Sequence, residues 1–369
     1  MSLEAAKKLI KKLDTLIADG NIGEPHFSDK SIKTFPLDRN GFRLIRELES
    51  KRKLFFVDGG NQEIIGAPNF SFQLNRISFS IWSGKNRIFE RKIPRKFEFF
   101  SATHSSFRDE EIHYDTTAIA ATDEFKKFIP DERDLSFNSL DRTVMNGNSR
   151  ADIERVASIA RRFAEWQFAS ILIENEMEYG DVIVLDGTLQ SAFTNERKYL
   201  ERLYENARRK GVVITGLSKT SSLFTTTGLS LLGAVNELAE DRAISGEWYY
   251  IIAESQSEDH NVVILFLKLN KVSKRIFRYE VQREKFYSLS DNELVEIMTL
   301  LVKNSSDATF PGYPYGLIDV DRLARVSYDE IEYYRGMILS QMSELGKWRK
   351  FSRHIYASDA HSILNILVG

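Results

Sequence analysis

Two short apolar runs in this chain each end at an aspartate that is followed by glycine. Asp58 ends the run in LFFVDGG (54–60), and Asp186 ends the run in DVIVLDGTL (181–189). Apolar runs of this length and composition are typical of buried strands. Two carboxylates at the ends of neighbouring strands can share divalent metal ions. Asp-Gly is also a common turn dipeptide, but its recurrence after two such runs favours a metal-binding site.

Composition excludes several classes of protein. The 369 residues are 42% hydrophobic and 28% charged, which is typical of a globular protein. There is no cysteine, so disulfides and cysteine-ligated zinc or iron–sulfur sites are excluded. No apolar stretch approaches the roughly 18 residues of a membrane-spanning helix, and the N-terminus lacks a secretory signal, so we expect a cytoplasmic protein. The net charge of −2 gives no global attraction to nucleic acid but does not exclude it as a substrate.

Hydrophobic periodicity predicts the order of the elements. An amphipathic helix is expected over 3–18, followed by a loop over 21–40. Next come a strand, two alternating segments read as antiparallel strands with one wet face, an irregular insertion and a long helix: 53–58, 70–82, 87–101, 104–148 and 150–178. The remaining strands are expected at 181–186, 211–217, 247–253, 261–268 and 275–281, and the remaining helices at 192–210, 290–303 and 328–345.

This order is that of a ribonuclease H-like α/β fold, a mixed sheet flanked by helices. In that fold the first and fourth strands are parallel neighbours about 4.8 Å apart, so Asp58 and Asp186 should face one metal pocket. We expect an N-terminal helical and loop extension over 1–50 and one domain over 51–369.

Further ligands are expected from helices near those strand ends. Glu165 lies in RRFAEWQFA beside an apolar stripe, although an exposed glutamate at the edge of the stripe explains the pattern equally well. Asp319 and Asp321 open a helix-like stretch, where N-capping is the simpler explanation. Beside the two strand aspartates, a metal or water-orienting role for Asp321 becomes credible.

Three other residues are candidates for contacts with a phosphate or a base. Lys219 follows the strand at 211–217 and could hold a scissile phosphate, although such lysines are usually only exposed. Tyr313 and Tyr315 could contact a phosphate or stack on a base, and ordinary packing is the alternative, more so for Tyr315. No nucleotide-binding glycine motif is present.

The chain resembles the NurA family of archaeal and bacterial nucleases from about residue 50 onward. The resemblance rests on short motifs whose order and spacing are specific together: VDGG at 57–60, RRFAE at 161–165, VIVLDGTL at 182–189, GLSKTS at 216–221, FLKL to IFRYEV at 266–281, GYPYGLIDVDRLARV at 312–326 and SDAHSILN at 358–365. It implies a ribonuclease H-like core, manganese-dependent DNA cleavage, a homodimer, and partnership with the hexameric HerA translocase.

The resemblance also implies roles for individual residues. Asp58 and Asp186 match the two metal-binding aspartates, and Tyr313 matches the tyrosine of a YP motif. Glu165 is similar to the helix glutamate, with Glu154 as a weaker substitute. Asp321 stands where relatives usually carry histidine, and DGG stands for their DGS. Aspartate can ligate a metal, so the change is compatible with activity, altered metal preference or a weakened enzyme.

The leading hypothesis is a metal-dependent DNA nuclease. Asp58, Glu165, Asp186 and Asp321 would hold Mn²⁺ or Mg²⁺, and Lys219 and Tyr313 would position the phosphate. The alternatives are a non-catalytic scaffold that binds DNA or a partner ATPase, and a ribonuclease H-like enzyme of another kind, such as one that cleaves RNA. The helices at 3–18 and 328–345 are candidates for dimer contacts, with core packing as the more common explanation.

Overall fold

The computed structural model describes residues 2–16 and 21–358. The strands are β1 Pro25–His26, β2 Ile32–Thr34, β3 Arg43–Leu44, β4 Leu54–Ala67, β5 Phe70–Ser83, β6 Asn86–Ile88, β7 Lys96–Arg108, β8 Glu111–Ala120, β9 Ser136–Asn138, β10 Val182–Asp186, β11 Val213–Ser218, β12 Phe224–Thr225, β13 Trp248–Ser257, β14 His260–Lys268 and β15 Phe277–Gln282. The helices are α1 Ser2–Leu16, η1 Asp123–Phe128, η2 Glu132–Asp134, α2 Ile153–Ala157, α3 Ile159–Asn175, α4 Arg197–Lys210, α5 Leu231–Asp241, α6 Arg283–Ser288, α7 Asp291–Asn304, α8 Tyr315–Ala324, α9 Tyr328–Glu344 and α10 Trp348–Ser358.

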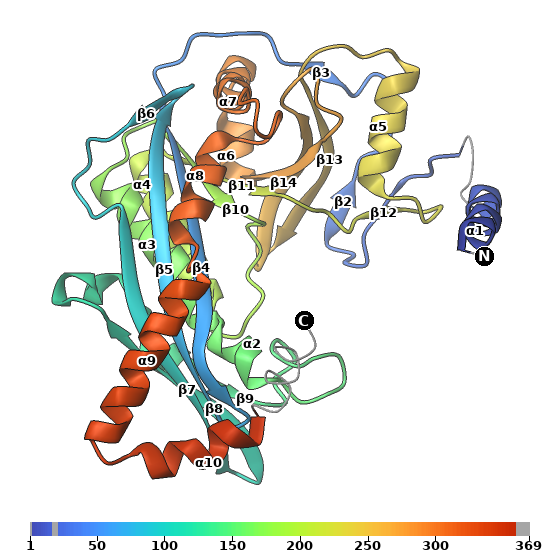
Figure 1. Cartoon of the computed structure of the whole chain (residues 1–369). Helices are drawn as coiled ribbons and strands as arrows, with labels where there is room; N and C mark the ends of the chain where they lie inside the picture. Colours follow the sequence, from blue (N-terminus) through green and yellow to red (C-terminus); the bar gives the residue numbers. More distant parts are fainter. Residues whose placement is uncertain (1, 17–20, 359–369) are drawn as a thin grey trace.

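One large mixed sheet organises the described chain (Figure 1). Its strand order is β2-β13-β14-β15-β11-β10-β4-β5-β7-β8-β9, with β3 beside β13 and β6 beside β5. The central strands β4, β10 and β11 are parallel, and the strands on both sides are antiparallel. The predicted parallel pairing of the first and fourth core strands is therefore confirmed, with Val57 opposite Leu185.

Helices cover both faces of the sheet. Successive residues of β4 alternate between two buried clusters, so Phe55 packs with α3 and α4, whereas Phe56 packs with α7 and α8. Burial of both faces explains why the central strands read as continuous apolar runs rather than as alternating ones. A third cluster lies at the far end of β4, beneath α9 and α10.

The prediction of one wet face was wrong for β5. Nearly all of Phe70–Ser83 is buried or half-buried because α8 packs over the side that the pattern assigned to water. The serines on that side bond to the helix instead: Ser78 Oγ donates to the carbonyl of Val320 at 3.0 Å, and Ser80 Oγ donates to that of Gly316 at 3.4 Å. These contacts help to fix α8, which carries Asp321, against the sheet.

Two further predictions in this half of the chain were wrong. The expected strand 87–101 is split into β6 and β7 by a segment that contains Pro94, which cannot donate to a strand ladder. The expected irregular insertion 104–148 contains the end of β7, all of β8, η1, η2 and β9. In β8 the residues Tyr114, Thr116 and Ala118 are buried and alternate with more exposed ones. The strand contains so many polar residues that its sequence does not show this alternation as a hydrophobic pattern.

Several boundaries also differ from the sequence expectation. The helix expected over 150–178 is divided into α2 and α3 at Ser158, and the helix expected over 192–210 begins only at Arg197. The loop expected over 21–40 contains β1 and β2. Because β2 and β3 pair with β13, residues before 51 contribute to the main sheet. The motif at 358–365 lies beyond the described residues except for Ser358.

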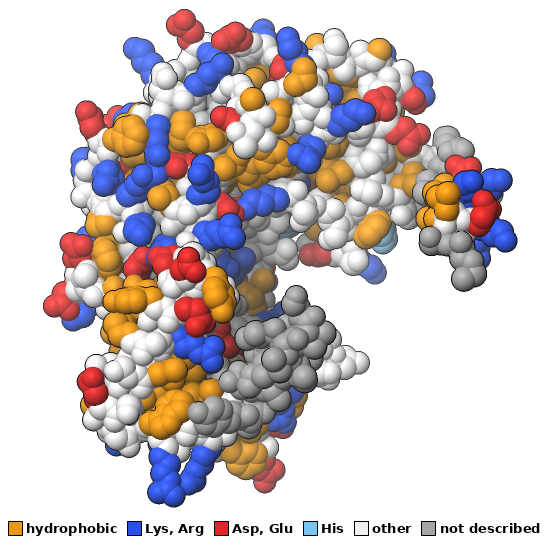
Figure 2. All heavy atoms as spheres, viewed as in Figure 1, with side chains coloured by type: hydrophobic (Ala, Val, Ile, Leu, Met, Phe, Trp, Pro, Cys, Tyr) orange, Lys and Arg blue, Asp and Glu red, His pale blue; other side chains and the backbone are white. Residues whose placement is uncertain are grey.

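The helices predicted for dimer contacts are largely exposed. The side chains of Leu9, Ile10 and Leu16 in α1 are 59–69% exposed, and Figure 1 places α1 at the margin of the molecule. Helix α9 packs on β4 and β5 through Ile331 and its neighbours, while hydrophobic side chains gather on its outer side (Figure 2). No helix in the described part of the chain is long and apolar enough to cross a membrane.

Candidate metal centre

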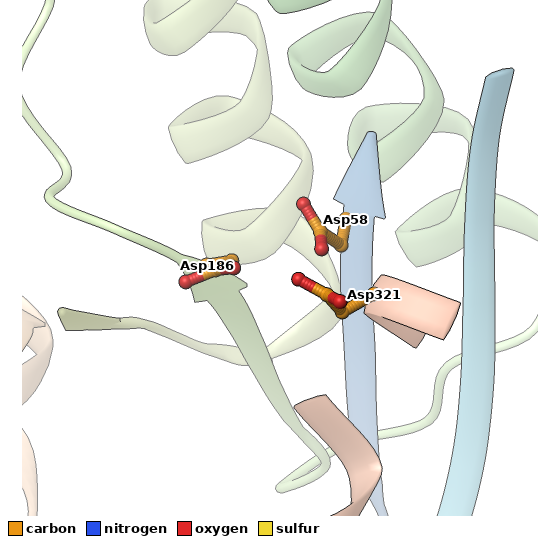
Figure 3. A group of neighbouring side chains, drawn as sticks. All are labelled: Asp58, Asp186 and Asp321. Atoms are coloured by element: carbon orange, nitrogen blue, oxygen red, sulfur yellow. The ribbon is translucent and has the colours of Figure 1, made fainter. Parts of the chain in front are cut away.

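Three aspartates that are far apart in the sequence converge at one end of the parallel strands. Asp58 comes from β4, Asp186 ends β10, and Asp321 projects from α8 (Figure 3). One carboxylate oxygen from each lies within 4.8 Å of the others. The predicted meeting of residues 58 and 186 at one pocket therefore agrees with the geometry, and Asp321 completes a three-carboxylate cluster.

The donor set fits a hard divalent cation. Oxygens on opposite sides of a Mg²⁺ ion at bond lengths of about 2.1 Å lie about 4.2 Å apart, so small rotations of the side chains would bring all three oxygens into range. Asp58 and Asp186 are half-buried and Asp321 is exposed, which leaves the cluster open toward solvent on one side. Carboxylate ligands without sulfur or imidazole favour Mg²⁺ or Mn²⁺ over softer metals.

The cluster has strong internal repulsion. Burial, together with the neighbouring charges of Glu165 and Asp186, raises the pKa of Asp58 to about 8, even though Lys219 acts in the opposite direction. A carboxyl group this far from its ordinary range is typical of sites that bind a cation or move protons.

Lys219 provides the positive charge that contacts the cluster directly. Its ammonium group donates to Asp186 Oδ2 at 2.7 Å and to Asp321 Oδ1 at 2.8 Å. Both contacts raise the pKa of Lys219 above its ordinary value, although burial alone would lower it. The predicted position of Lys219 beside the crevice agrees with the structure.

Glu165 lies beside the cluster but is held by another residue. Its Oε1 accepts a hydrogen bond from Nη1 of Arg161 at 2.5 Å, one turn earlier in α3. Burial raises the pKa of Glu165, and the Arg161 guanidinium acts against that shift. Glu165 is not one of the three residues whose oxygens come within 4.8 Å of one another. Glu154, the weaker substitute, is exposed on α2.

The glycines after Asp58 allow this close approach. The prediction that the first strand ends at Asp58 was wrong, because β4 continues for nine residues beyond it. A Cβ on Gly59 would lie 2.4 Å from Oε1 of Glu165, and a Cβ on Gly60 would lie 2.4 Å from the backbone oxygen of Ala324. The Asp-Gly-Gly sequence is therefore not a turn but a stretch of strand over which α3 and α8 come near.

We expect Gly60→Ala to lower both stability and metal binding. The obstructing atom is backbone, so the end of α8 must move, and Asp321 lies only three residues before Ala324. Overpacking of this kind destabilises by about 1–3 kcal/mol. Thermal unfolding and Mn²⁺ titration measure the two effects.

Gly336→Ala is the matched control for this substitution. Gly336 lies within α9 and has no atom within 4 Å of an added Cβ. Alanine should therefore leave metal binding unchanged and stabilise the helix by up to about 1 kcal/mol. Equal melting temperatures and affinities for the two variants would contradict the close-approach explanation.

The structure separates Asp319 from Asp321. Asp319 and Asp321 lie in the middle of α8, so the N-capping alternative was wrong, and Pro314 occupies the N-cap position. Asp319 forms ion pairs with Arg87 at 2.6 Å and Arg95 at 3.2 Å instead of joining the cluster.

Tyr313 is a packing residue with an unusual hydroxyl group. The side chain is 1% exposed and its ring contacts those of Phe277 and Phe310, so it presents no free face to a base. Its hydroxyl group is buried without a hydrogen-bond partner among the described residues. Burial and the charges of Asp186, Asp58 and Asp321 raise its pKa, so the neutral hydroxyl group remains available as a donor.

A cleft of about 1100 Å³ leads away from the aspartates. It runs along β4 between Asp58 and Pro68 and is walled by residues of α2, α8, α9 and α10. Its lining mixes apolar side chains such as Ile64 and Ile331 with acids and two arginines, Arg325 and Arg335.

The comparison with protein families matches this chain to the NurA domain over residues 52–326. The chain belongs to the NurA family. The crystal structure of the NurA nuclease from Sulfolobus solfataricus is similar over 93% of this chain and 95% of that one, with a TM-score of 0.53 and 13% identity. At this identity the similarity shows the fold, and it confirms the predicted ribonuclease H-like mixed sheet flanked by helices.

Other solved structures are more distant. Endonuclease V from Ciona intestinalis, in complex with DNA that contains an inosine followed by a ribo-adenosine, has a TM-score of 0.35 and 12% identity, covering 87% of this chain and 97% of that one. The catalytic domain of human Endonuclease V has a TM-score of 0.34 and 12% identity, covering 94% and 98%. Neither similarity is strong enough to carry an argument. No curated protein sequence matches this chain.

Sequence reasoning missed two features of this NurA site. It quoted RRFAE as a motif but gave Arg161 no role, although a spacing of four residues on a helix places Arg161 and Glu165 side by side. It also placed Gly59 and Gly60 beyond the end of the first strand. A pair of glycines directly after a functional carboxylate is a signal of close backbone approach, and it could have suggested the packing of α3 and α8 here.

Proposed function

We propose that this NurA-family protein is a DNA nuclease that depends on Mn²⁺ or Mg²⁺. The convergence of Asp58, Asp186 and Asp321 from two parallel strands and a helix carries the proposal. Membership of a family that includes a solved nuclease supports it. Divalent ions bound by such carboxylates lower the pKa of water and stabilise the charge on the phosphodiester.

The residues around the cluster divide the remaining tasks. Asp58, Asp186 and Asp321 would hold the ion, and Glu165, paired with Arg161, would complete its ligands or those of a second ion. Lys219 would hold a non-bridging oxygen of the scissile phosphate. The unpartnered hydroxyl group of Tyr313 would orient a ligand carboxylate or a water molecule.

The cleft along β4 supports a polymeric substrate. It begins at Asp58 and Asp321 and continues past the residues of β4, so a strand bound there would extend away from the ion. The acidic side chains that line the cleft, such as Glu63 and Glu154, repel phosphate groups. A bound DNA strand would therefore face the cleft with its bases rather than with its sugar–phosphate backbone.

Cleavage of labelled single-stranded DNA, double-stranded DNA and RNA of one sequence tests the proposal. We expect DNA cleavage with Mn²⁺ or Mg²⁺, none with EDTA, and little RNA cleavage. Absence of cleavage with every metal, in a folded protein that still binds DNA, would instead support the scaffold alternative. In that case the ion pair between Asp321 and Lys219, at 2.8 Å, would take the place of a bound metal. Preferential RNA cleavage would support the other ribonuclease H-like alternative.

We also propose that the protein acts as a homodimer with a HerA-type hexameric translocase in processing DNA ends. The exposed apolar residues of α1 and the outer side of α9 supply surfaces for such contacts. Light scattering of the full chain, alone and with the translocase, would show a dimer mass and a larger complex. A monomer that forms no complex would contradict both assignments without affecting the nuclease proposal.

A further inference from the structure

The ammonium group of Lys219 lies where two carboxylates of the metal cluster converge. It contacts Asp186 at 2.7 Å and Asp321 at 2.8 Å. These are two of the three residues whose oxygens approach within 4.8 Å. One lysine therefore contacts two carboxylates that a bound cation would also contact.

Lys219 is also the most movable member of this group. Asp58 and Asp186 lie on buried parallel strands, and Asp321 lies on a helix packed against the sheet. Lys219 is the first residue after β11, and its side chain is 43% exposed. Its flexible stem allows the ammonium group to leave without movement of the backbone.

A divalent ion and this ammonium group compete for the same oxygens. Each is positive, so they also repel one another at the short distance that the cluster imposes. Binding of the ion must therefore break or weaken both lysine contacts.

We propose that Lys219 is an internal counter-ion of the metal site, so that uptake of the metal and release of the ammonium group are one exchange. The inference rests on the proposed metal site. The exchange offsets part of the negative charge of the aspartates before the ion arrives, and it frees a positive charge at the site when the ion is in place. A phosphate that then enters meets both cations, which ties its binding to metal occupancy.

A purely structural role for Lys219 gives the opposite result. If the lysine serves only to hold Asp186 and Asp321 in position for the ion, its removal loosens the site and weakens metal binding. If it is a competing counter-ion, its removal strengthens metal binding. The sign of the change in affinity separates the two roles.

Calorimetric titration of the metal-free full chain with Mn²⁺ measures this sign. We expect Lys219→Met to bind Mn²⁺ about tenfold more tightly than the wild type, within the range of typical coupling between linked binding events. Lys219→Arg retains the charge and should give no such gain. Lys33→Met removes an exposed lysine that is paired at 3.2 Å with Glu254, on β13, and should leave the affinity unchanged.

Thermal unfolding provides a second readout. In EDTA, Lys219→Met should melt below the wild type because the aspartates lose their counter-ion, and Mn²⁺ should raise its melting temperature by more than that of the wild type. Cleavage should nevertheless fall, because the phosphate loses the lysine.

Each outcome supports or overturns the inference. Unchanged or weaker Mn²⁺ binding by a folded Lys219→Met protein overturns the counter-ion role and leaves the proposed nuclease intact. If the wild type itself binds no Mn²⁺, or binds it equally well after Asp186→Asn, the proposed metal site fails and the inference fails with it.

Discussion

Asp186→Asn should reduce the rate of DNA cleavage at least about a thousandfold while leaving the fold intact. Asparagine has nearly the same size, so the packing of β10 against β4 and β11 is retained. The substitution removes one negative charge from the ligand set and one of the two charged partners of Lys219. Loss of one preorganised electrostatic contact in an active site typically lowers rates 10²–10³-fold, and here the affinity for the ion falls as well.

Asp181→Asn is a matched control for this result. Asp181 directly precedes β10, at the end of the strand opposite Asp186, where its carboxylate accepts backbone hydrogen bonds from Lys53 and Glu178, each at 2.9 Å. The single amide oxygen of asparagine can accept only one of these two bonds, so the variant should be less stable than the wild type. Because the position lies at the opposite end of β10 from Asp186, activity should stay within about threefold. Single-turnover cleavage with saturating Mn²⁺ and circular dichroism of both variants provide the measurements. A folded Asp186→Asn protein that cleaves within tenfold of the wild-type rate would show that the site is assigned wrongly.

The central part of this site could be predicted because it depends on local pattern and one topological rule. Two apolar runs that end in aspartate predict buried strands, and their separation by antiparallel segments and a long helix predicts parallel neighbours. The carboxylates then meet where the parallel pairing of the two strands ends, as Asp58 and Asp186 do.

Contacts between distant elements account for what the sequence pattern did not predict. Nothing in the alternation of β5 shows that α8, about 240 residues later, packs over its polar face, although Ser78 Oγ bonds to Val320 there. The same packing lets β4 continue through Gly59 and Gly60, which look like a turn when read locally. The metal-binding role of Asp321 could be suggested only from the presence of the other two aspartates. Its own segment was ambiguous, because the sequence does not show that α8 begins at Tyr315 and places Asp321 in the middle of the helix.

The motif RRFAE predicts only part of the environment of Glu165. The motif places it on the correct helix and near Asp58, whose pKa its charge helps to raise. The four-residue spacing on a helix also indicates its partner, Arg161. The motif does not show that Glu165 lies outside the three-aspartate cluster, which depends on how α3 packs against β4.

Metal-free protein should lose stability as the pH rises from about 4 to about 8, and Asp58→Asn should reduce that loss. The pKa of Asp58 is raised from 3.8 to about 8, first by burial and then by Glu165 and Asp186. Between these values the folded state keeps a proton that the unfolded state has released. Because the folded state binds more protons, the free energy of unfolding falls with rising pH in this window.

The expected effect is large because each pKa unit corresponds to about 1.4 kcal/mol. Asparagine carries no titrating group and removes the repulsion with Glu165 and Asp186. In EDTA at pH 8, Asp58→Asn should therefore melt several degrees above the wild type, whereas at pH 4 the two should melt together. The gain in stability would accompany a loss of cleavage, as expected for a residue that is needed for activity but destabilises the folded protein.

Addition of Mn²⁺ provides the internal control. The ion favours the ionised form of Asp58, so it should stabilise the wild type most at high pH, where protons no longer compete for the carboxylate. In Asp58→Asn the same concentration should produce a much smaller shift in melting temperature. If the metal-free wild type and the variant instead lose stability in parallel from pH 4 to pH 8, Asp58 does not carry the raised pKa. The loss of stability with pH would then come from groups other than Asp58 and its neighbours Glu165 and Asp186.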